Sequence, residues 1–255
     1  MLTIDINCDM GESFGVYTMG QDARIMPYIS SANVACGFHA GDPRVMRKTV
    51  QLAKEHQVRV GAHPSFPDLV GFGRRNMVLS YEEIRSDVLY QIGALSAFAT
   101  EAKWPLQHVK PHGQLNNMAM TNPAYAEAIV DAIAAFNPEL IVISYGGLLM
   151  EAAQAKGLPV AYEVYADRAY QADGQLVPRS VPGAVIHDVH QVLERVMHMI
   201  THQEIVAITG EHLPRKIDTI CVHGDTPGAD EIAMRLSSFL KSQNVRIAPL
   251  SPVDR

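Results

Sequence analysis

The sequence has few cysteines and no long apolar segment. Its three cysteines, at positions 8, 36 and 221, are odd in number, and each lies in an apolar, strand-like stretch. This pattern is typical of buried, reduced thiols rather than of a disulfide scaffold. No uninterrupted apolar run is longer than residues 132–136, and the first residues lack a basic start followed by an apolar core. We therefore expect no membrane segment, no secretion and a cytoplasmic location.

An excess of positive charge is also missing. The formal net charge is −6 and the pI is about 6.0, so no basic surface is expected to hold a phosphodiester backbone. The chain also contains no Gly-x-x-x-x-Gly-Lys-Ser/Thr loop, no His-Glu-x-x-His helix and no Cys-x-x-Cys pair. These absences argue against a nucleic-acid partner, a standard phosphate-binding loop and a motif-based zinc site.

What the sequence does contain is a regular alternation of apolar strands and amphipathic helices. Over 255 residues we see no linker, repeat or low-complexity tract, and we expect one domain spanning 1–255. Strands are predicted at 5–12, 34–39, 59–63, 107–112, 140–143, 160–165 and 219–225, with a short one at 245–248. Helices are predicted from Asp42-Pro43, behind a Ser80/Glu83 capping box, from Asn122-Pro123, after 145–147, over 189–200 and from Thr226-Pro227.

An open doubly wound sheet and a closed barrel both fit this alternation. We favour an α/β fold with a closed parallel β/α barrel, because polar residues gather at the carboxyl ends of nearly all strands, where barrel enzymes carry their active sites. These residues are Asp9, Glu12, His39, His63, Lys110, His112, Asp167, His223 and Asp225.

The first strand, 5–12, has the clearest pattern. Asp5, Asn7 and Asp9 alternate with apolar residues, so a strand places all three on one face. Glu12 follows just past the strand end. The neighbouring apolar residues indicate an interior strand, in which unpaired carboxylates are costly, so this polar face is expected to bind a ligand or take part in catalysis.

Four of the eleven histidines end apolar strands, namely His39, His63, His112 and His223. The others fall in helix ends and loops, except His198 and His202, whose spacing places both on the solvent side of their helix. Histidines and carboxylates at one rim can hold a divalent metal or transfer protons, and the sequence leaves both open.

Three further features are candidates for substrate contacts. Lys110 can balance the acids of the first strand or stabilise negative charge on a substrate oxygen. Arg74 and Arg75 lie in a long Gly/Pro-rich loop and can clamp a carboxylate. The segment 223–228 precedes a helix start, where barrels commonly bind phosphate on backbone N–H groups.

Five segments together resemble the LamB/YcsF family, the A subunits of prokaryotic 5-oxoprolinases. They are 5–12 (DINCDMGE), 33–42 (NVACGFHAGD), 61–65 (GAHPS), 109–113 (VKPHG) and 222–225 (VHGD). The resemblance covers essentially the whole chain. It implies a seven-stranded β/α barrel related to glycoside hydrolases and polysaccharide deacetylases. It also implies opening of 5-oxoproline to glutamate with ATP as co-substrate, and separate B and C subunits as partners.

Within that resemblance we expect two groups of site residues. Asp9 or Glu12 activates a water, and His39, His63 and Lys110 polarise or neutralise the reacting oxygen. Substrate binding is expected from Asp5, Asn7, Arg74, His112, His223 and Asp225. Two other functions remain open from the residues alone: a metal-dependent amide or N-acetyl deacetylase, and a scaffold that docks a catalytic partner.

Overall fold

The computed structural model describes residues 1–222, 224 and 228–251. Within this part of the chain, seven parallel strands form a closed barrel, because the last strand pairs with the first. In barrel order they are β1 (Thr3–Met10), β2 (Ser31–Ala35), β3 (Arg59–His63), β4 (Leu106–Val109), β5 (Ile141–Ser144), β6 (Val160–Tyr165) and β9 (Thr219–Val222). The closed barrel favoured from the sequence is confirmed.

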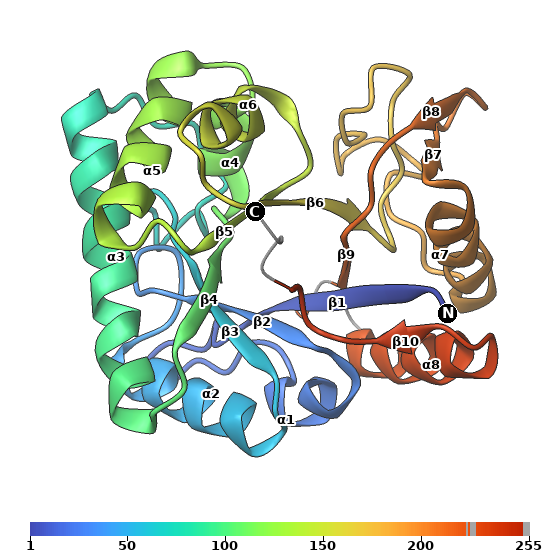
Figure 1. The fold of residues 1–255 in the computed structure, drawn as a ribbon, viewed down its shortest axis with the longest axis horizontal. Coiled ribbons are helices and arrows are strands. Elements are labelled where there is room, and N and C mark those ends of the chain that lie inside the picture. Colours follow the sequence, from blue (N-terminus) through green and yellow to red (C-terminus); the bar gives the residue numbers. More distant parts are fainter. Residues whose placement is uncertain (223, 225–227, 252–255) are drawn as a thin grey trace.

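Helices surround the strands on the outside of the molecule (Figure 1). They are α1 (Asp22–Ile25), α2 (Pro43–Glu55), α3 (Tyr81–Ala102), α4 (Gly113–Ala119), α5 (Pro123–Phe136), α6 (Gly147–Ala155), α7 (Val189–His202) and α8 (Ala229–Ser242), with a 3₁₀ turn, η1 (Met26–Tyr28). In the described ranges, none of these helices has the length and apolar character that a membrane crossing requires.

The predicted helix starts are confirmed where they lie in described residues. Asp42 accepts hydrogen bonds from the first turn of α2, and Asn122 does the same for α5. Ser80 and Glu83 form the reciprocal capping box of α3. The predicted start of the last helix at 226–227 lies outside the described residues, and α8 begins at Ala229.

β2 and β4 end earlier than the sequence predicted. β2 covers 31–35 and not 34–39, because the chain turns at Gly37, whose φ is +95°. β4 ends at Val109, two residues before Pro111, which has no N–H for a strand ladder. β9 ends at Val222, and the predicted continuation through His223 and Asp225 lies outside the described residues. His39 and Lys110 therefore lie beyond the ends of their strands.

Several small elements were not predicted, among them α1 and η1, whereas a short terminal strand was. β7 (Glu204–Val206) and β8 (His212–Pro214) form an antiparallel hairpin between α7 and β9. The short α4 was also missed. The predicted terminal strand is confirmed as β10 (Arg246–Ile247), which pairs with β1 beside the barrel.

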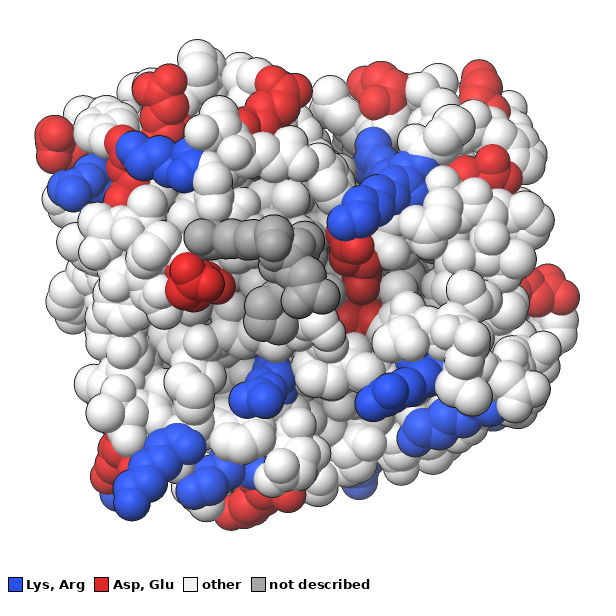
Figure 2. All heavy atoms as spheres, viewed as in Figure 1, with Lys and Arg blue, Asp and Glu red and all other residues white. Residues whose placement is uncertain are grey.

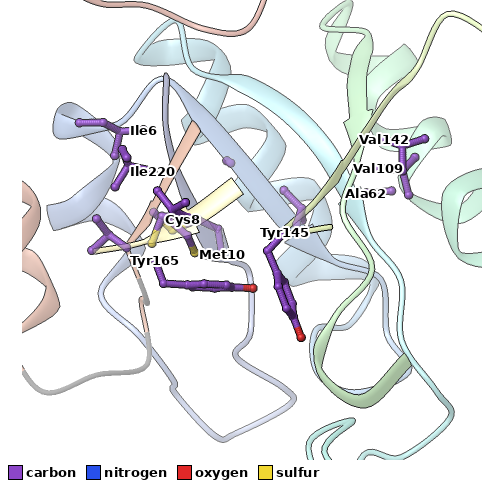
Figure 3. Close-up of a cluster of buried hydrophobic side chains, with 14 of the residues drawn as sticks. Ile6, Cys8, Met10, Ala62, Val109, Val142, Tyr145, Tyr165 and Ile220 are labelled. Atoms are coloured by element: carbon purple, nitrogen blue, oxygen red, sulfur yellow. The ribbon is translucent and has the colours of Figure 1, made fainter. Parts of the chain in front are cut away.

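The strands separate an apolar outer layer from a polar interior. Ile6, Cys8 and Met10 of β1 are buried with apolar residues of the neighbouring strands (Figure 3). The alternate residues of β1, which include Asp5 and Asn7, point into the barrel and bond to side chains of the neighbouring strands. The three cysteines are buried and free, as expected. On the face shown in Figure 2, acidic and basic side chains are interspersed.

Gly61 on β3 makes room for the imidazole of His108 on β4. A Cβ at Gly61 lies 2.0 Å from the His108 ring, which is held by a 2.8 Å contact to Asn33 Oδ1. We expect Gly61→Ala to lower the free energy of unfolding by about 1–3 kcal/mol, because a rigid, buried ring must move. Urea unfolding measures this change.

The matched control is Gly93→Ala on α3, where a Cβ meets nothing within 4 Å. That substitution should raise the free energy of unfolding by about 0.5–1 kcal/mol, because Ala has the higher helix propensity. Equal effects of the two substitutions would contradict the packing explanation for Gly61.

Candidate functional site

A cavity of about 750 Å³ opens at the carboxyl ends of the barrel strands. One wall carries residues that the sequence had singled out, namely Asp9, His63, Lys110 and His112. Asp9 is near the end of β1, His63 ends β3, and Lys110 and His112 follow β4. The structure therefore brings together groups that are distant in the chain, Asp9 and Lys110 being 101 positions apart, as the closed barrel predicted.

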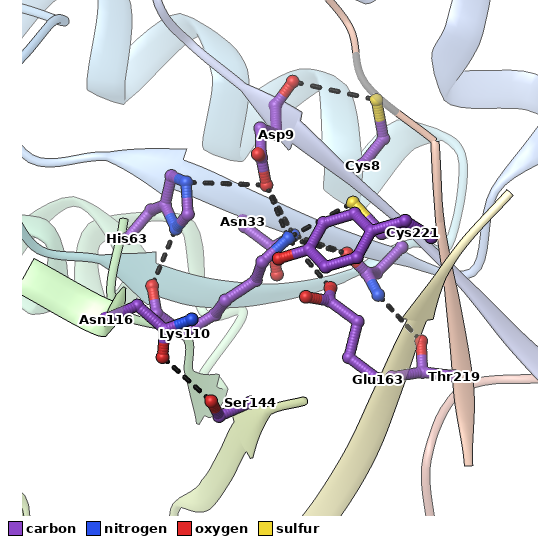
Figure 4. Close-up of polar contacts among 12 residues, drawn as sticks. Cys8, Asp9, Asn33, His63, Lys110, Asn116, Ser144, Glu163, Thr219 and Cys221 are labelled. Carbon is purple, nitrogen blue, oxygen red and sulfur yellow. Dashed lines mark hydrogen bonds and ion pairs between the residues drawn. The ribbon is translucent and has the colours of Figure 1, made fainter. Parts of the chain in front are cut away.

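Lys110 is the centre of a buried charged network (Figure 4). Its Nζ lies 2.9 Å from Asp9 Oδ1 and 2.8 Å from Glu163 Oε1, and it donates at 3.2 Å to the Cys221 sulfur. Burial alone would lower the pKa of Lys110, but the negative groups around it, Asp9 first, outweigh burial and raise that pKa well above its usual value. The charged form of Lys110 is therefore favoured in the barrel.

A second cluster contains three histidines and one carboxylate, all buried: Glu12, His39, His63 and His112. The His39 ring stacks on the His112 ring, with centroids 3.8 Å apart and planes 5° apart. His39 Nε2 is 3.5 Å from Glu12 Oε1. Burial, reinforced by the neighbouring imidazoles, holds the pKa values of His39 and His112 well below their usual value. The uncharged forms of these two rings are therefore favoured.

The lining of the cavity carries more basic than acidic side chains. Four arginines and Lys110 are basic, whereas the acidic residues among the described lining are Asp9 and Asp173. The four are Arg74, Arg168, Arg179 and Arg215. Arg168 is buried and donates to the carbonyls of Val177 and Ala184, and Arg215 donates to the carbonyl of Tyr145. A cavity with this balance favours an anionic ligand.

The sequence named two arginines of the long loop, Arg74 and Arg75, as candidates for binding a carboxylate, and the structure separates them. Arg75 pairs with the buried Asp68, which also accepts from the backbone of Gly71. These bonds fix the loop that follows β3. Arg74 contacts the Phe72 ring at 4.8 Å and lines the cavity, so it is the arginine of this loop that remains a candidate for substrate binding.

Asp5 and Asn7 lie deeper in the barrel and are absent from the described lining of the cavity. Asp5 Oδ1 accepts hydrogen bonds from Ser30 and Ser31, both at 2.7 Å. Asn7 donates to Thr219 at 2.8 Å. Their hydrogen bonds connect three strands, while direct contact with substrate stays a prediction for both residues.

Asp5 makes stability depend on pH. Burial raises its pKa from 3.8 to about 6 in the folded chain, against the hydrogen bonds of Thr219 and the two serines. Because the folded state holds this proton more tightly than the unfolded state, the contribution of Asp5 is fully present below pH 4 and is lost as pH rises through 6. We expect the free energy of unfolding of the parent to fall relative to that of Asp5→Asn by about 2–3 kcal/mol between pH 4 and pH 7.

Urea unfolding of both proteins across this range measures the change. The control is Asp131→Asn on α5, because Lys156 and Tyr81 lower the pKa of Asp131. Its contribution has the opposite sign, so it is present at neutral pH and is lost on acidification. A constant difference between parent and Asp5→Asn from pH 4 to 7 would contradict the assignment.

Several site residues were missed from the sequence, and two predicted ones are not described. Glu163 is fully buried in β6 and pairs with Lys110. His108 had been assigned to a loop or helix end, but it lies inside the barrel on β4, and burial lowers its pKa to about 3. His223 and Asp225 lie outside the described residues.

A further His/Glu group lies at the surface, between α7 and the β7–β8 hairpin. Glu204 Oε1 is 2.8 Å from His198 Nε2 and 2.7 Å from His212 Nδ1. These three residues and the buried Glu12 cluster are the groups among the described residues that are close enough to share a metal ion. The hairpin was not predicted, so no sequence pattern had connected His212 with His198.

Comparisons with known proteins agree with this architecture. A model of the LamB/YcsF family matches residues 4–255. The A subunit of the 5-oxoprolinase of Pyrococcus horikoshii is 52% identical over 250 residues, 98% of each chain. The crystal structure of a lactam utilization protein from Thermus thermophilus is 45% identical, covers 98% of this chain and 100% of its own, and superposes with a TM-score of 0.93. A T48 deacetylase structure, 12% identical over 97% of this chain and 87% of its own with a TM-score of 0.51, shares the fold alone.

Proposed function

Because this chain belongs to the LamB/YcsF family, we propose that it acts as the A subunit of a 5-oxoprolinase and opens the lactam ring of 5-oxoproline to L-glutamate. One observation supports this most directly. The cavity combines an acid, a buried lysine and imidazoles on one wall with four arginines elsewhere in its lining. An anionic lactam needs both parts, because its carboxylate must be bound and its amide carbon must be attacked.

The proposal includes ATP as co-substrate. In 5-oxoproline the amine and the carboxyl that ring opening releases remain tethered, and tethered groups have very high effective concentrations. The closed ring therefore resists hydrolysis. Phosphorylation of the amide oxygen by ATP releases ADP and makes the amide carbon open to attack by water. The adduct then collapses with cleavage of the C–N bond, so that the ring nitrogen leaves as the amine and an acyl phosphate remains. A second water hydrolyses this acyl phosphate to glutamate and inorganic phosphate. The B and C subunits are part of the proposal as partners.

Within the cavity, Asp9 is our choice for the group that activates water. It lines the cavity, whereas Glu12 is not part of the described lining. Lys110 Nζ lies 2.9 Å from Asp9 Oδ1 and stabilises negative charge that develops beside it, and His63 Nε2 lies 3.4 Å from the same oxygen. The arginines, Arg74 included, hold the substrate carboxylate. His112 completes the wall, and roles for His39, His223 and Asp225 stay part of the hypothesis.

The test is glutamate formation from 5-oxoproline by the reconstituted subunits. We expect glutamate, ADP and phosphate in equal amounts when ATP, the B and C subunits and this chain are all present. Omitting this chain should abolish glutamate formation. Unchanged glutamate formation without it would contradict the proposal.

A metal-dependent amide or N-acetyl deacetylase is the second candidate, and the buried Glu12, His39, His63 and His112 cluster favours it. Hydrolysis of an N-acetyl substrate by the chain alone, without ATP, would support this function. A scaffold role would instead be indicated if the complete assembly makes glutamate equally well when Asp9 is replaced by Asn.

A further inference from the structure

Two histidine nitrogens face each other in the cavity wall. His63 Nε2 and His112 Nδ1 are 3.0 Å apart. The other nitrogen of each ring is directed at a backbone carbonyl: His63 Nδ1 lies 2.6 Å from the carbonyl of Lys110, and His112 Nε2 lies 2.9 Å from that of Phe72. A carbonyl oxygen only accepts, so each of these nitrogens carries its ring's proton. With these outer nitrogens as the donors, the two facing nitrogens are left to share one further cation. That cation is either a proton, which His63 Nε2 can also direct at Asp9 Oδ1 3.4 Å away, or a metal ion.

The surrounding backbone fixes this arrangement. Phe72 has a φ of +54°, which is uncommon for a residue with a side chain, and its carbonyl is the acceptor for His112. Gly73 follows, and a Cβ there would lie 2.8 Å from the His112 ring. Histidines that bind metal almost always donate their other ring N–H to a carbonyl or carboxylate, as both rings do here.

Other donors gather at the same point. One atom each from Glu12, His39, His63 and His112 lie within 4.8 Å of one another. Both ring nitrogens of His39 are buried without a hydrogen-bond partner in the described structure. A single proton shared by two rings does not need a carboxylate and a third imidazole beside it, whereas a divalent ion takes three or four such ligands.

The ring orientations decide which donors can bind together. The planes of His63 and His112 are 84° apart, so both lone pairs can converge on one ion at about 2.0–2.1 Å. His39 and His112 are parallel and stacked, so their lone pairs lie in separate planes and do not meet at one ion. His39 is instead a positioning residue, with Nε2 3.5 Å from Glu12 Oε1.

We infer that His63 Nε2, His112 Nδ1 and the Glu12 carboxylate bind one divalent transition-metal ion of the Zn²⁺ class. Two imidazoles and a carboxylate form a ligand set that leaves a position open, as in catalytic sites. When bound, such an ion polarises a carbonyl oxygen or lowers the pKa of water. The role of the ion in the reaction rests on the proposed function, whereas its binding does not.

The surface group formed by His198, Glu204 and His212 is the natural competitor. There both imidazoles already contact Glu204 Oε1, at 2.8 and 2.7 Å, so no cation is required. A His198→Asn/His212→Asn variant removes this competitor and serves as the matched control.

Metal binding is measured on the full chain after treatment with a chelator. We expect one equivalent of Co²⁺ or Zn²⁺ by titration, a visible Co²⁺ absorption band, and no comparable uptake of Mg²⁺. The His198→Asn/His212→Asn variant should keep this equivalent. The affinity for Co²⁺ or Zn²⁺ should fall about 100-fold or more in His112→Asn and, separately, in Glu12→Gln. Loss of a group that only hydrogen-bonds to a metal ligand already costs about 10- to 100-fold, and loss of the ligand itself should cost at least as much. Far-UV circular dichroism checks the fold of each variant.

Two results would overturn the inference. One is loss of metal uptake in the His198→Asn/His212→Asn variant, and the other is a parent chain that binds neither Co²⁺ nor Zn²⁺. If one of the two site variants does not fold, the other and the surface control still decide between the sites. Failure of the proposed function is distinguishable: a chain that binds the ion but yields no glutamate contradicts that function alone. Glutamate formation by demonstrably metal-free protein contradicts the metal site alone.

Discussion

Lys110→Met is expected to lower the free energy of unfolding by about 3–5 kcal/mol. The side chain of Met is similar in length, so the substitution removes charge and leaves little empty space. Asp9 and Glu163 then lose the ammonium that lies 2.9 and 2.8 Å from them, and Glu163 is fully buried. A buried charge without its partner is strongly destabilising. Urea unfolding at pH 7 measures the loss.

The origin of this loss can be tested with a second substitution. Adding Glu163→Gln to Lys110→Met removes one of the unpaired carboxylates, and we expect it to recover about 1–3 kcal/mol. The surface control is Lys156→Met, which breaks the partly exposed ion pair with Asp131 and should cost less than about 1 kcal/mol. If Lys110→Met costs no more than Lys156→Met, the network does not stabilise the barrel.

The sequence was sufficient for the barrel because local signals agreed with the global fold. Strand and helix periods alternate along the chain, and the helix caps at Asp42, Ser80 and Asn122 all form. The polar side of β1 was predicted from its period of two, and Asp9 does reach Lys110 across the barrel. Asp9, His63, Lys110 and His112 were predicted at the carboxyl ends of the strands, and this position was enough to predict that they share one wall of the cavity.

The rest of the site depends on contacts that no local pattern encodes. Glu163 could have been found from the sequence, because it is the one carboxylate in an otherwise largely apolar strand. The same reasoning identified the acids of β1. Arg179 and Arg215 gave none, because they reach the cavity from a long loop and from the end of an unpredicted hairpin. The facing nitrogens of His63 and His112 depend on side-chain directions set by the loop after β3.

Asp9 joins the two halves of this site. Its Oδ1 accepts from Lys110 and Asn33, both at 2.9 Å, and lies 3.4 Å from His63 Nε2. The Asp9 carboxylate therefore connects the charged network around Lys110 with the cluster of imidazoles that contains His63. In the proposed function Asp9 acts on the reacting atoms directly, while its neighbours hold it in place.

We accordingly expect Asp9→Asn to lower the rate of glutamate formation by the reconstituted assembly about 10²- to 10⁴-fold, the range for loss of a general base. Asn has nearly the same shape, and its carbonyl oxygen can still accept from Lys110 and Asn33. Glu163 still pairs with Lys110, so the fold should be retained and the loss should appear in kcat; far-UV circular dichroism checks the fold. Initial rates at saturating ATP and 5-oxoproline measure it.

Asp87→Asn on the outer helix α3 makes the same chemical change away from the cavity, and its rate should equal that of the parent. Glu12→Gln separates the two carboxylates at this wall. If Asp9→Asn retains a tenth or more of the parental rate, Asp9 does not activate the water. A rate loss in Glu12→Gln that saturating Zn²⁺ or Co²⁺ does not restore then assigns that role to Glu12. If both variants keep the parental rate, the carboxylates at the end of β1 do not carry the chemistry, and the cavity acts by binding alone.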